Sequence, residues 1–193
     1  MRSNLRRTIV VALSAALASL VTFAGLSPVA AYPPGAVLTL VANKTHVSSS
    51  ETVTFTATYA APNSSVKFTY GKQTKTVKAD AAGVAVVALK TGGTGVWVAK
   101  AQNLAATATT TVYAPKVSLT KSSANRGTTN SVKIQYTQPG AVLTLMVGGQ
   151  AYSGVGAGSS TVTINFVMPA KGRYTILVFI NAQQFTSLRV DSK

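Results

Sequence analysis

One stretch decides the fold: Ser65–Ala101, SVKFTYGKQTKTVKADAAGVAVVALKTGGTGVWVAKA. It opens with Val66, Phe68 and Tyr70, which are two residues apart and separated by polar side chains. A period of two is typical of a strand that buries one face. Asp80–Gly83 then supplies a turn sequence, in which glycine suits a positive φ angle. The stretch therefore predicts antiparallel strands joined by short turns.

The same pattern continues on both sides of this stretch and then returns. The alternation at 53–57 is repeated at 132–136, and the Gly-x-aromatic sequence at 95–97 is repeated at 172–174. No stretch after Leu26 has helical periodicity, which excludes an α/β architecture. We expect an all-β chain with two similar domains, at residues 32–114 and 115–193, joined by the short linker Ala114-Pro115.

The N-terminus has the three-part pattern of a secretory signal peptide. Met1–Arg7 is basic, Ile9–Leu26 is apolar, and Val29–Ala31 supplies small residues ahead of Tyr32. This order predicts a signal peptide at residues 1–31 that is cleaved after Ala31. The apolar run is also long enough to span a bilayer marginally, so an uncleaved anchor is the alternative. After cleavage we expect no membrane span and a secreted or cell-surface protein.

The composition is strongly basic and contains no cysteine. The chain has 18 Lys and Arg against three Asp and Glu, a formal net charge of +15. Removal of Arg2, Arg6 and Arg7 with the signal peptide leaves 15 basic and three acidic side chains, a net charge of +12. Such a charge favours binding to polyanions, and its alternative role is to keep the protein soluble. The lack of cysteine excludes disulfides and thiolate metal sites.

Residues that support catalysis are scarce. Beyond the signal peptide the chain has one histidine, His46, and the carboxylates Glu51, Asp80 and Asp191. They lie in separate segments without the spacing of any known site, so we expect no catalytic residues, metal or cofactor. We expect His46 to be a solvated loop residue. Trp97, the only tryptophan, is expected to fill the core between two sheets.

One group of residues suggests a binding site. Lys67, Lys72, Lys75 and Lys78 fall on two neighbouring predicted strands and their turn, with Tyr70 nearby. We predict that these four lysines form a docking face for an acidic polymer. The alternative is that lysines on an edge strand prevent aggregation between sheet edges.

Several short motifs carry a family resemblance. They are Val66-x-Phe68, Thr74–Val77, Asp80-x-x-Gly83-x-Ala85 and Gly95-x-Trp97-Val98. Together they resemble the bacterial immunoglobulin-like (Big-type) repeat domains of surface and secreted proteins. The resemblance covers most of residues 36–113 and is weaker over 115–190, where the Asp-x-x-Gly turn is absent. It implies two tandem immunoglobulin-like antiparallel β-sandwiches that act as a spacer, stalk or adhesive module outside the cell.

These observations lead to one main functional hypothesis. We expect a non-catalytic, exported bacterial structural or adhesive module, held on anionic cell-wall polymers by its basic surface. The first alternative is an extracellular module that binds a surface protein through an edge strand or loops. A remote alternative is a small secreted enzyme. Nucleic acid is not an expected partner, because the export segment places the chain outside the cell.

Overall fold

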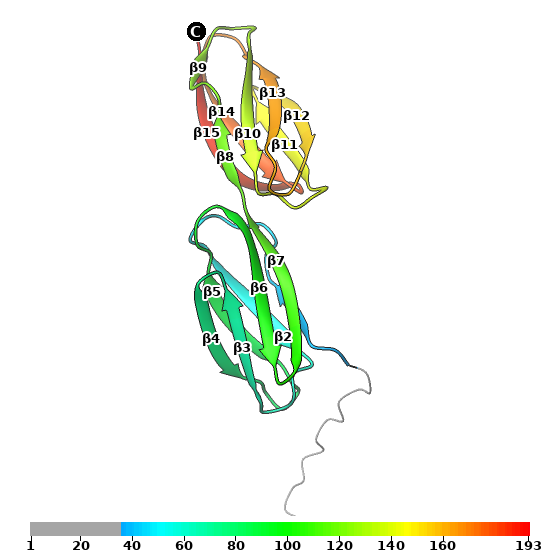
Figure 1. Ribbon diagram of the computed structural model, residues 1–193. Helices are drawn as coiled ribbons and strands as arrows, with labels where there is room; N and C mark the ends of the chain where they lie inside the picture. Colours follow the sequence, from blue (N-terminus) through cyan, green and yellow to red (C-terminus); the bar gives the residue numbers. More distant parts are fainter. Residues whose placement is uncertain (1–35) are drawn as a thin grey trace, which may run out of the picture.

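The computed structural model describes residues 36–193, all of whose regular elements are β-strands (Figure 1). The predicted signal peptide lies outside the described residues. We call residues 36–114 the N-terminal half and residues 115–193 the C-terminal half. The strands of the N-terminal half are β1 (Thr39–Ala42), β2 (Thr52–Thr58), β3 (Ser65–Tyr70), β4 (Gln73–Lys78), β5 (Ala85–Lys90), β6 (Gly95–Asn103) and β7 (Ala106–Ala114). Those of the C-terminal half are β8 (Lys116–Leu119), β9 (Ser123–Ala124), β10 (Thr129–Gln135), β11 (Val142–Val147), β12 (Gln150–Val155), β13 (Val162–Val167), β14 (Gly172–Ile180) and β15 (Gln183–Ser192).

Each half contains two sheets that enclose a hydrophobic core. In the N-terminal half the sheets have the strand orders β1-β2-β5 and β4-β3-β6-β7. In the C-terminal half the orders are β13-β10-β8 and β12-β11-β14-β15-β9. Every pairing is antiparallel except the short parallel contact of β15 with β9. The prediction of an all-β sandwich fold is confirmed, although β9 was not expected.

Two separate clusters of buried side chains fill the halves. The inward positions of the alternating strands supply them, as Phe55, Phe68 and Tyr70 do in the N-terminal half. Ile134 and Phe166 are among the corresponding side chains of the C-terminal half. The halves follow one another end to end (Figure 1). That each half is an independent domain, with boundaries at 32–114 and 115–193, stays a prediction.

Trp97 takes a position near the one expected for it. Its side chain is half-buried, packs against the N-terminal core and lies beside Tyr70, with 6.2 Å between the ring centroids. Its indole N–H donates a hydrogen bond to the carbonyl oxygen of Gly93 at 3.0 Å. A Cβ added at Gly92 would lie 2.7 Å from the Trp97 ring, so glycine is needed there for this packing. Trp97 therefore closes one end of the core.

Candidate functional site

The four predicted lysines lie on a hairpin of the N-terminal half. Lys67 belongs to β3, Lys75 and Lys78 belong to β4, and Lys72 is in the turn between these strands. All four side chains are exposed. Because β4 is the last strand of its sheet, the hairpin forms an open edge of the N-terminal half.

The alternation of the strands divides these lysines between two surfaces. Lys75 is the partner of Phe68, which is fully buried. Lys75 therefore belongs to the inner face of the sheet, at its edge. Lys67 and Lys78 belong to the opposite, outer face. Tyr70 is buried against Phe55, with 4.8 Å between ring centroids, so its ring is not available to a ligand on this face. A single docking face therefore cannot use all four lysines in the same way.

A further lysine joins the outer face from a distant part of the sequence. Lys100 of β6 is the partner of Thr69 of β3, and its exposed side chain alternates with the buried Ala99 and Ala101. Sequence reasoning missed Lys100 because β6 follows two intervening strands. The alternation within β6 was the available signal, but the pairing of β3 with β6 was needed to use it.

Lys78, Lys67 and Lys100 form a diagonal row across three neighbouring strands. Lys78 is opposite Ser65, two residues before Lys67, and Lys100 is opposite Thr69, two residues after it. Diagonal neighbours in a sheet are about 7–8 Å apart at the backbone. Around the row, threonines occupy the outer face of the same sheet. We call the following set the Lys–Thr face: Lys67, Lys78, Lys100, Thr69, Thr74, Thr76, Thr107, Thr109 and Thr111.

The positive charge is not balanced within the described residues. Glu51 is paired with Lys44, and Asp191 is paired with Arg173 at 3.0 Å. Asp80 accepts hydrogen bonds from the backbone N–H groups of Ala82 and Val84.

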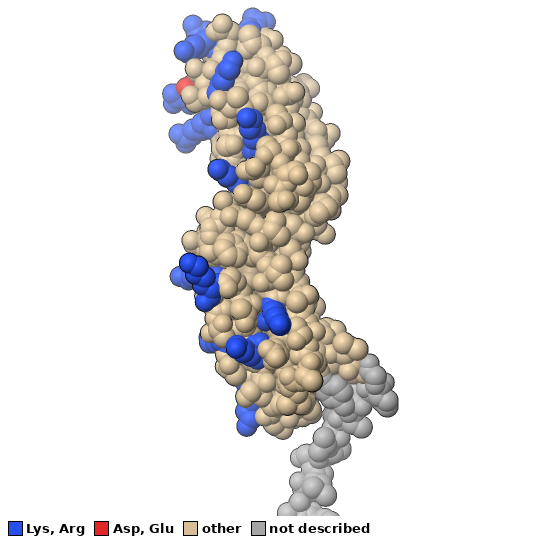
Figure 2. All heavy atoms as spheres, in the orientation of Figure 1, with Lys and Arg blue, Asp and Glu red and all other residues tan. Residues whose placement is uncertain are grey.

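All three carboxylates are thus engaged within the protein. Of the 15 Lys and Arg after residue 35, the two named above are the ones with an ion pair among the described residues. Basic side chains gather along the left side of the view in Figure 2, whereas the right side of the C-terminal half has none.

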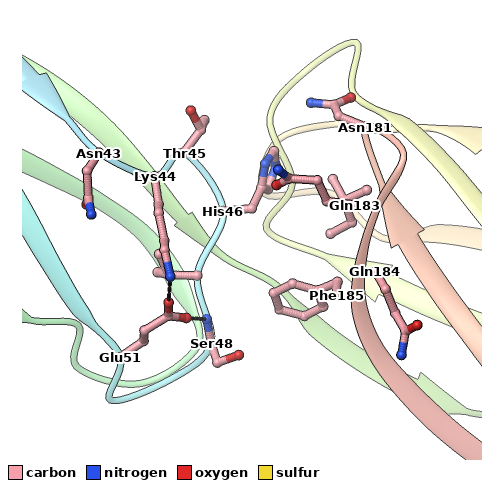
Figure 3. A pocket seen from close by; sticks show the side chains of 12 residues that line it. Asn43, Lys44, Thr45, His46, Ser48, Glu51, Asn181, Gln183, Gln184 and Phe185 are labelled. Atoms are coloured by element: carbon pink, nitrogen blue, oxygen red, sulfur yellow. Dashed lines mark hydrogen bonds and ion pairs between the residues drawn. The ribbon is translucent and has the colours of Figure 1, made fainter.

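A polar cleft of about 650 Å³ lies where the two halves meet. The loop 43–48 and Glu51 line it from one side, and the segment 180–185 lines it from the other. The side chains of His46 and Gln183 point toward each other across the cleft, and Phe185 forms part of its wall (Figure 3).

His46 is a structural residue of this junction. Its Nε2 atom accepts a hydrogen bond of 3.1 Å from the backbone N–H of Gln138 in the C-terminal half. Its ring stacks on Tyr113, with 5.6 Å between centroids. Burial lowers the pKa of the imidazole below its usual value. The prediction of a solvated loop histidine was therefore wrong. Sequence reasoning missed this contact because the partner, Gln138, is far away in the sequence.

The cleft brings His46 and Glu51 to one concave surface, but it does not arrange them as an acid–base pair. One oxygen of Glu51 accepts from Lys44 and the other accepts from the backbone N–H of Ser48 at 2.8 Å. The hydrogen bond to Lys44 lowers the pKa of this carboxyl. Figure 3 shows Glu51 at the lower left, away from the His46 and Gln183 side chains near the centre of the view.

The described residues offer no group of side chains that could bind a metal ion. Residues 36–193 include no cluster of three or more His, Cys, Asp or Glu placed to hold a metal ion. The same residues also contain no helix with the length and apolarity needed to cross a membrane.

Comparisons with known proteins give similarities in structure alone. No protein-family model matches the chain, and no curated protein matches its sequence. The structure is similar to invasin, a bacterial integrin-binding protein, with a TM-score of 0.38 and 18% identity over 81% of this chain and 39% of that one. It is similar to the C-terminal 282-residue fragment of intimin, in complex with the intimin-binding domain of the translocated intimin receptor, with a TM-score of 0.47 and 18% identity over 81% of this chain and 64% of that one.

A third similarity is to domains 3 and 4 of rat CD4, with a TM-score of 0.40 and 11% identity over 76% of this chain and 97% of that one. The chain thus spans less than two thirds of the invasin and intimin chains. At these TM-scores the similarities carry no information on function.

Proposed function

We propose that this protein is a non-catalytic structural or adhesive module outside the cell, retained on anionic envelope polymers through its Lys–Thr face. The uncompensated positive charge is the observation that carries the proposal. Each carboxylate in residues 36–193 is engaged within the protein, which leaves most basic side chains free to attract a polyanion. Such an attraction concentrates the protein on a surface of opposite charge.

The Lys–Thr face gives this attraction a defined place. Lys78, Lys67 and Lys100 present three cations in a diagonal row, which suits an extended chain of regularly spaced negative groups. The surrounding threonine hydroxyls both donate and accept hydrogen bonds, so they can contact the uncharged parts of the same polymer. Lys72 and Lys75 extend the positive surface at the rim of the sheet.

The test is retention of purified Tyr32–Lys193 on isolated cell walls across a salt series, using walls with and without their anionic polymers. We expect retention to require the polymers and to fall steeply with salt, because salt screens contacts between exposed charges. Absence of binding at low salt would refute electrostatic retention and leave the charge as a solubility feature.

Matched variants separate a defined face from net charge. One variant replaces Lys67, Lys78 and Lys100 by threonine. The control replaces three exposed lysines of the C-terminal half by threonine, namely Lys121, Lys133 and Lys171. Both lose three charges, so a binding face predicts weaker retention of the first variant than of the control. Equal loss in both would mean that the polymer responds to net charge and that the Lys–Thr face is not a site.

A further inference from the structure

The two halves contain equivalent edge strands, of which one is basic and the other is uncharged. β4 ends the sheet β4-β3-β6-β7, and β12 takes the same position in β12-β11-β14-β15-β9. Each is the second strand of a hairpin. β4 has the sequence QTKTVK, with two lysines, whereas β12 has the sequence QAYSGV and no charge. Lysines on an edge strand prevent pairing with another chain, so of these two equivalent edges β4 has this protection and β12 lacks it.

The surroundings of β12 are also uncharged. Lys133 and Lys171 are separated by a segment, residues 134–170, with no Asp, Glu, Lys or Arg. This segment includes the strands β11, β12 and β13. On the right side of the C-terminal half in Figure 2, where these strands lie, the visible surface has no basic side chain. An uncharged region of this length is unexpected in a chain with a net charge of +15.

The outer face next to this edge is apolar. Val142 of β11 and Val155 of β12 are partners and are 56% and 63% exposed. On the same face Met146 is the partner of Leu177, and Thr144 is the partner of Phe179. These central side chains are half-buried and do not belong to the C-terminal core. An exposed apolar face beside an open strand edge has the properties of an interaction surface.

We propose that β12 pairs with β12 of a second copy of this chain. Two copies of one strand are complementary when they run antiparallel about a twofold axis, which is the geometry of most homodimers. The pairing would join two five-stranded sheets into one continuous sheet. It would also place the apolar faces next to each other along the extended sheet.

The charge pattern favours a second copy over other occupants. Two molecules with the same large positive charge repel each other at surfaces that contain lysine. At β12 they meet through an uncharged edge and keep the Lys–Thr faces apart, since those faces lie in the N-terminal halves. A partner selected by negative charge would instead bind the lysines and leave this edge open.

The small side chains of β12 allow close approach. Ala151, Ser153 and Val155 are exposed on the strand, and Gly154 faces inward. A Cβ at Gly154 would lie 3.0 Å from the side chain of Ile164, so glycine lets β12 lie close to the opposite sheet. The edge is thus held in place by its own core and presents no charged group to an incoming strand, and its one aromatic side chain, Tyr152, is half-buried against Phe166.

Sedimentation of Tyr32–Lys193, which contains every described residue, tests the proposal at low and high salt. We expect a reversible dimer that is stable or strengthened at high salt, because salt screens the repulsion between the two positive molecules. Retention on polymers must weaken under the same conditions, so this inference and the proposed function can fail separately. A chain that stays monomeric over the whole concentration range at high salt would overturn the dimer.

A pair of matched substitutions locates the interface. Ala151→Lys places a charge on β12, and Ala88→Lys places the same charge on an exposed position of β5, the edge of another sheet. We expect the first variant to be monomeric at concentrations where the second remains dimeric, with thermal unfolding used to confirm that both are folded. Dimerisation of Ala151→Lys equal to that of the unsubstituted chain would exclude β12, and loss of the dimer in both variants would do the same.

Discussion

Protonation of His46 should loosen the junction between the two halves. A backbone N–H can only donate, so the bond from Gln138 requires an unprotonated Nε2 atom. The imidazolium form has no acceptor, and its charge would face that donor. It is the one hydrogen bond between the halves that we find among the described residues. Lowering the pH is therefore a specific perturbation of this contact.

The structure sets the size and direction of the effect. A net contribution of about 0.5–1.5 kcal/mol is typical of one hydrogen bond, which corresponds to as much as about a tenfold change in the equilibrium between the joined and separated junction. Burial lowers the pKa of His46 below the usual value near 6.5. A depressed pKa in the folded state means that the stabilisation is complete above about pH 6.5 and is lost as the pH falls through the folded value.

Other charged groups around His46 respond at different pH values. Lys44, in the same loop as His46, and Glu51, just before β2, form an ion pair that lines the same cleft. The pKa of Glu51 is lowered, mainly by the hydrogen bond from Lys44, so this carboxyl is protonated only in more acidic solution. Tyr113 contributes its ring, which stacks on the imidazole. The facing segment 180–185 contributes no charged residue.

Nuclear magnetic resonance gives a direct assay, because the chain has one histidine and therefore one imidazole titration. We expect a pKa below 6.5, and a change in the relative tumbling of the halves over the same pH range. His46→Phe is the control, since it keeps a ring against Tyr113 and removes the acceptor. Its junction should be loose at every pH. An imidazole pKa at or above 6.5, or the same pH dependence in His46→Phe, would refute the reasoning.

Two further substitutions test the cores. Asn103→Ala should destabilise the N-terminal half by about 1–3 kcal/mol in chemical denaturation, because the buried Asn103 side chain accepts from the backbone N–H of Ala61 at 2.9 Å and that donor would lose its partner. An unchanged midpoint would contradict this role. Phe166→Ala should cost about 3–5 kcal/mol in the C-terminal half, since Phe166 is 1% exposed. If the halves are independent domains, the unfolding of the N-terminal half stays unchanged, and a common shift of both would refute the proposed division at Pro115.

Local alternation was enough to predict most of the strands, although not the two-residue β9. Val53 and Phe55, or Val132 and Ile134, are two residues apart, and the period itself says that one face of the strand is buried. The same information placed Lys67 and Lys78 on neighbouring strands, because a short turn connects β3 to β4. These predictions needed contacts only between segments that are adjacent in the sequence.

Contacts between distant segments could not be predicted in this way. Lys100 reaches the Lys–Thr face through the pairing of β6 with β3, and His46 is fixed by Gln138, which belongs to the other half. No sequence motif identifies either contact. The alternation within a strand shows which of its residues are buried, but not which strand lies beside it. The face of Lys75 also depended on its partner Phe68 rather than on its own position in the sequence.

The short connection between the halves has a mechanical consequence. β7 ends at Ala114 and β8 begins at Lys116, so Pro115 alone separates two strands that belong to different sheets. One residue extends by at most about 3.5 Å, which leaves almost no slack. A pulling force applied to the two ends of the chain would pass directly from one sheet to the other. Such a module would keep its length under load until a strand is torn from its sheet, and would then lengthen in large steps rather than stretch gradually.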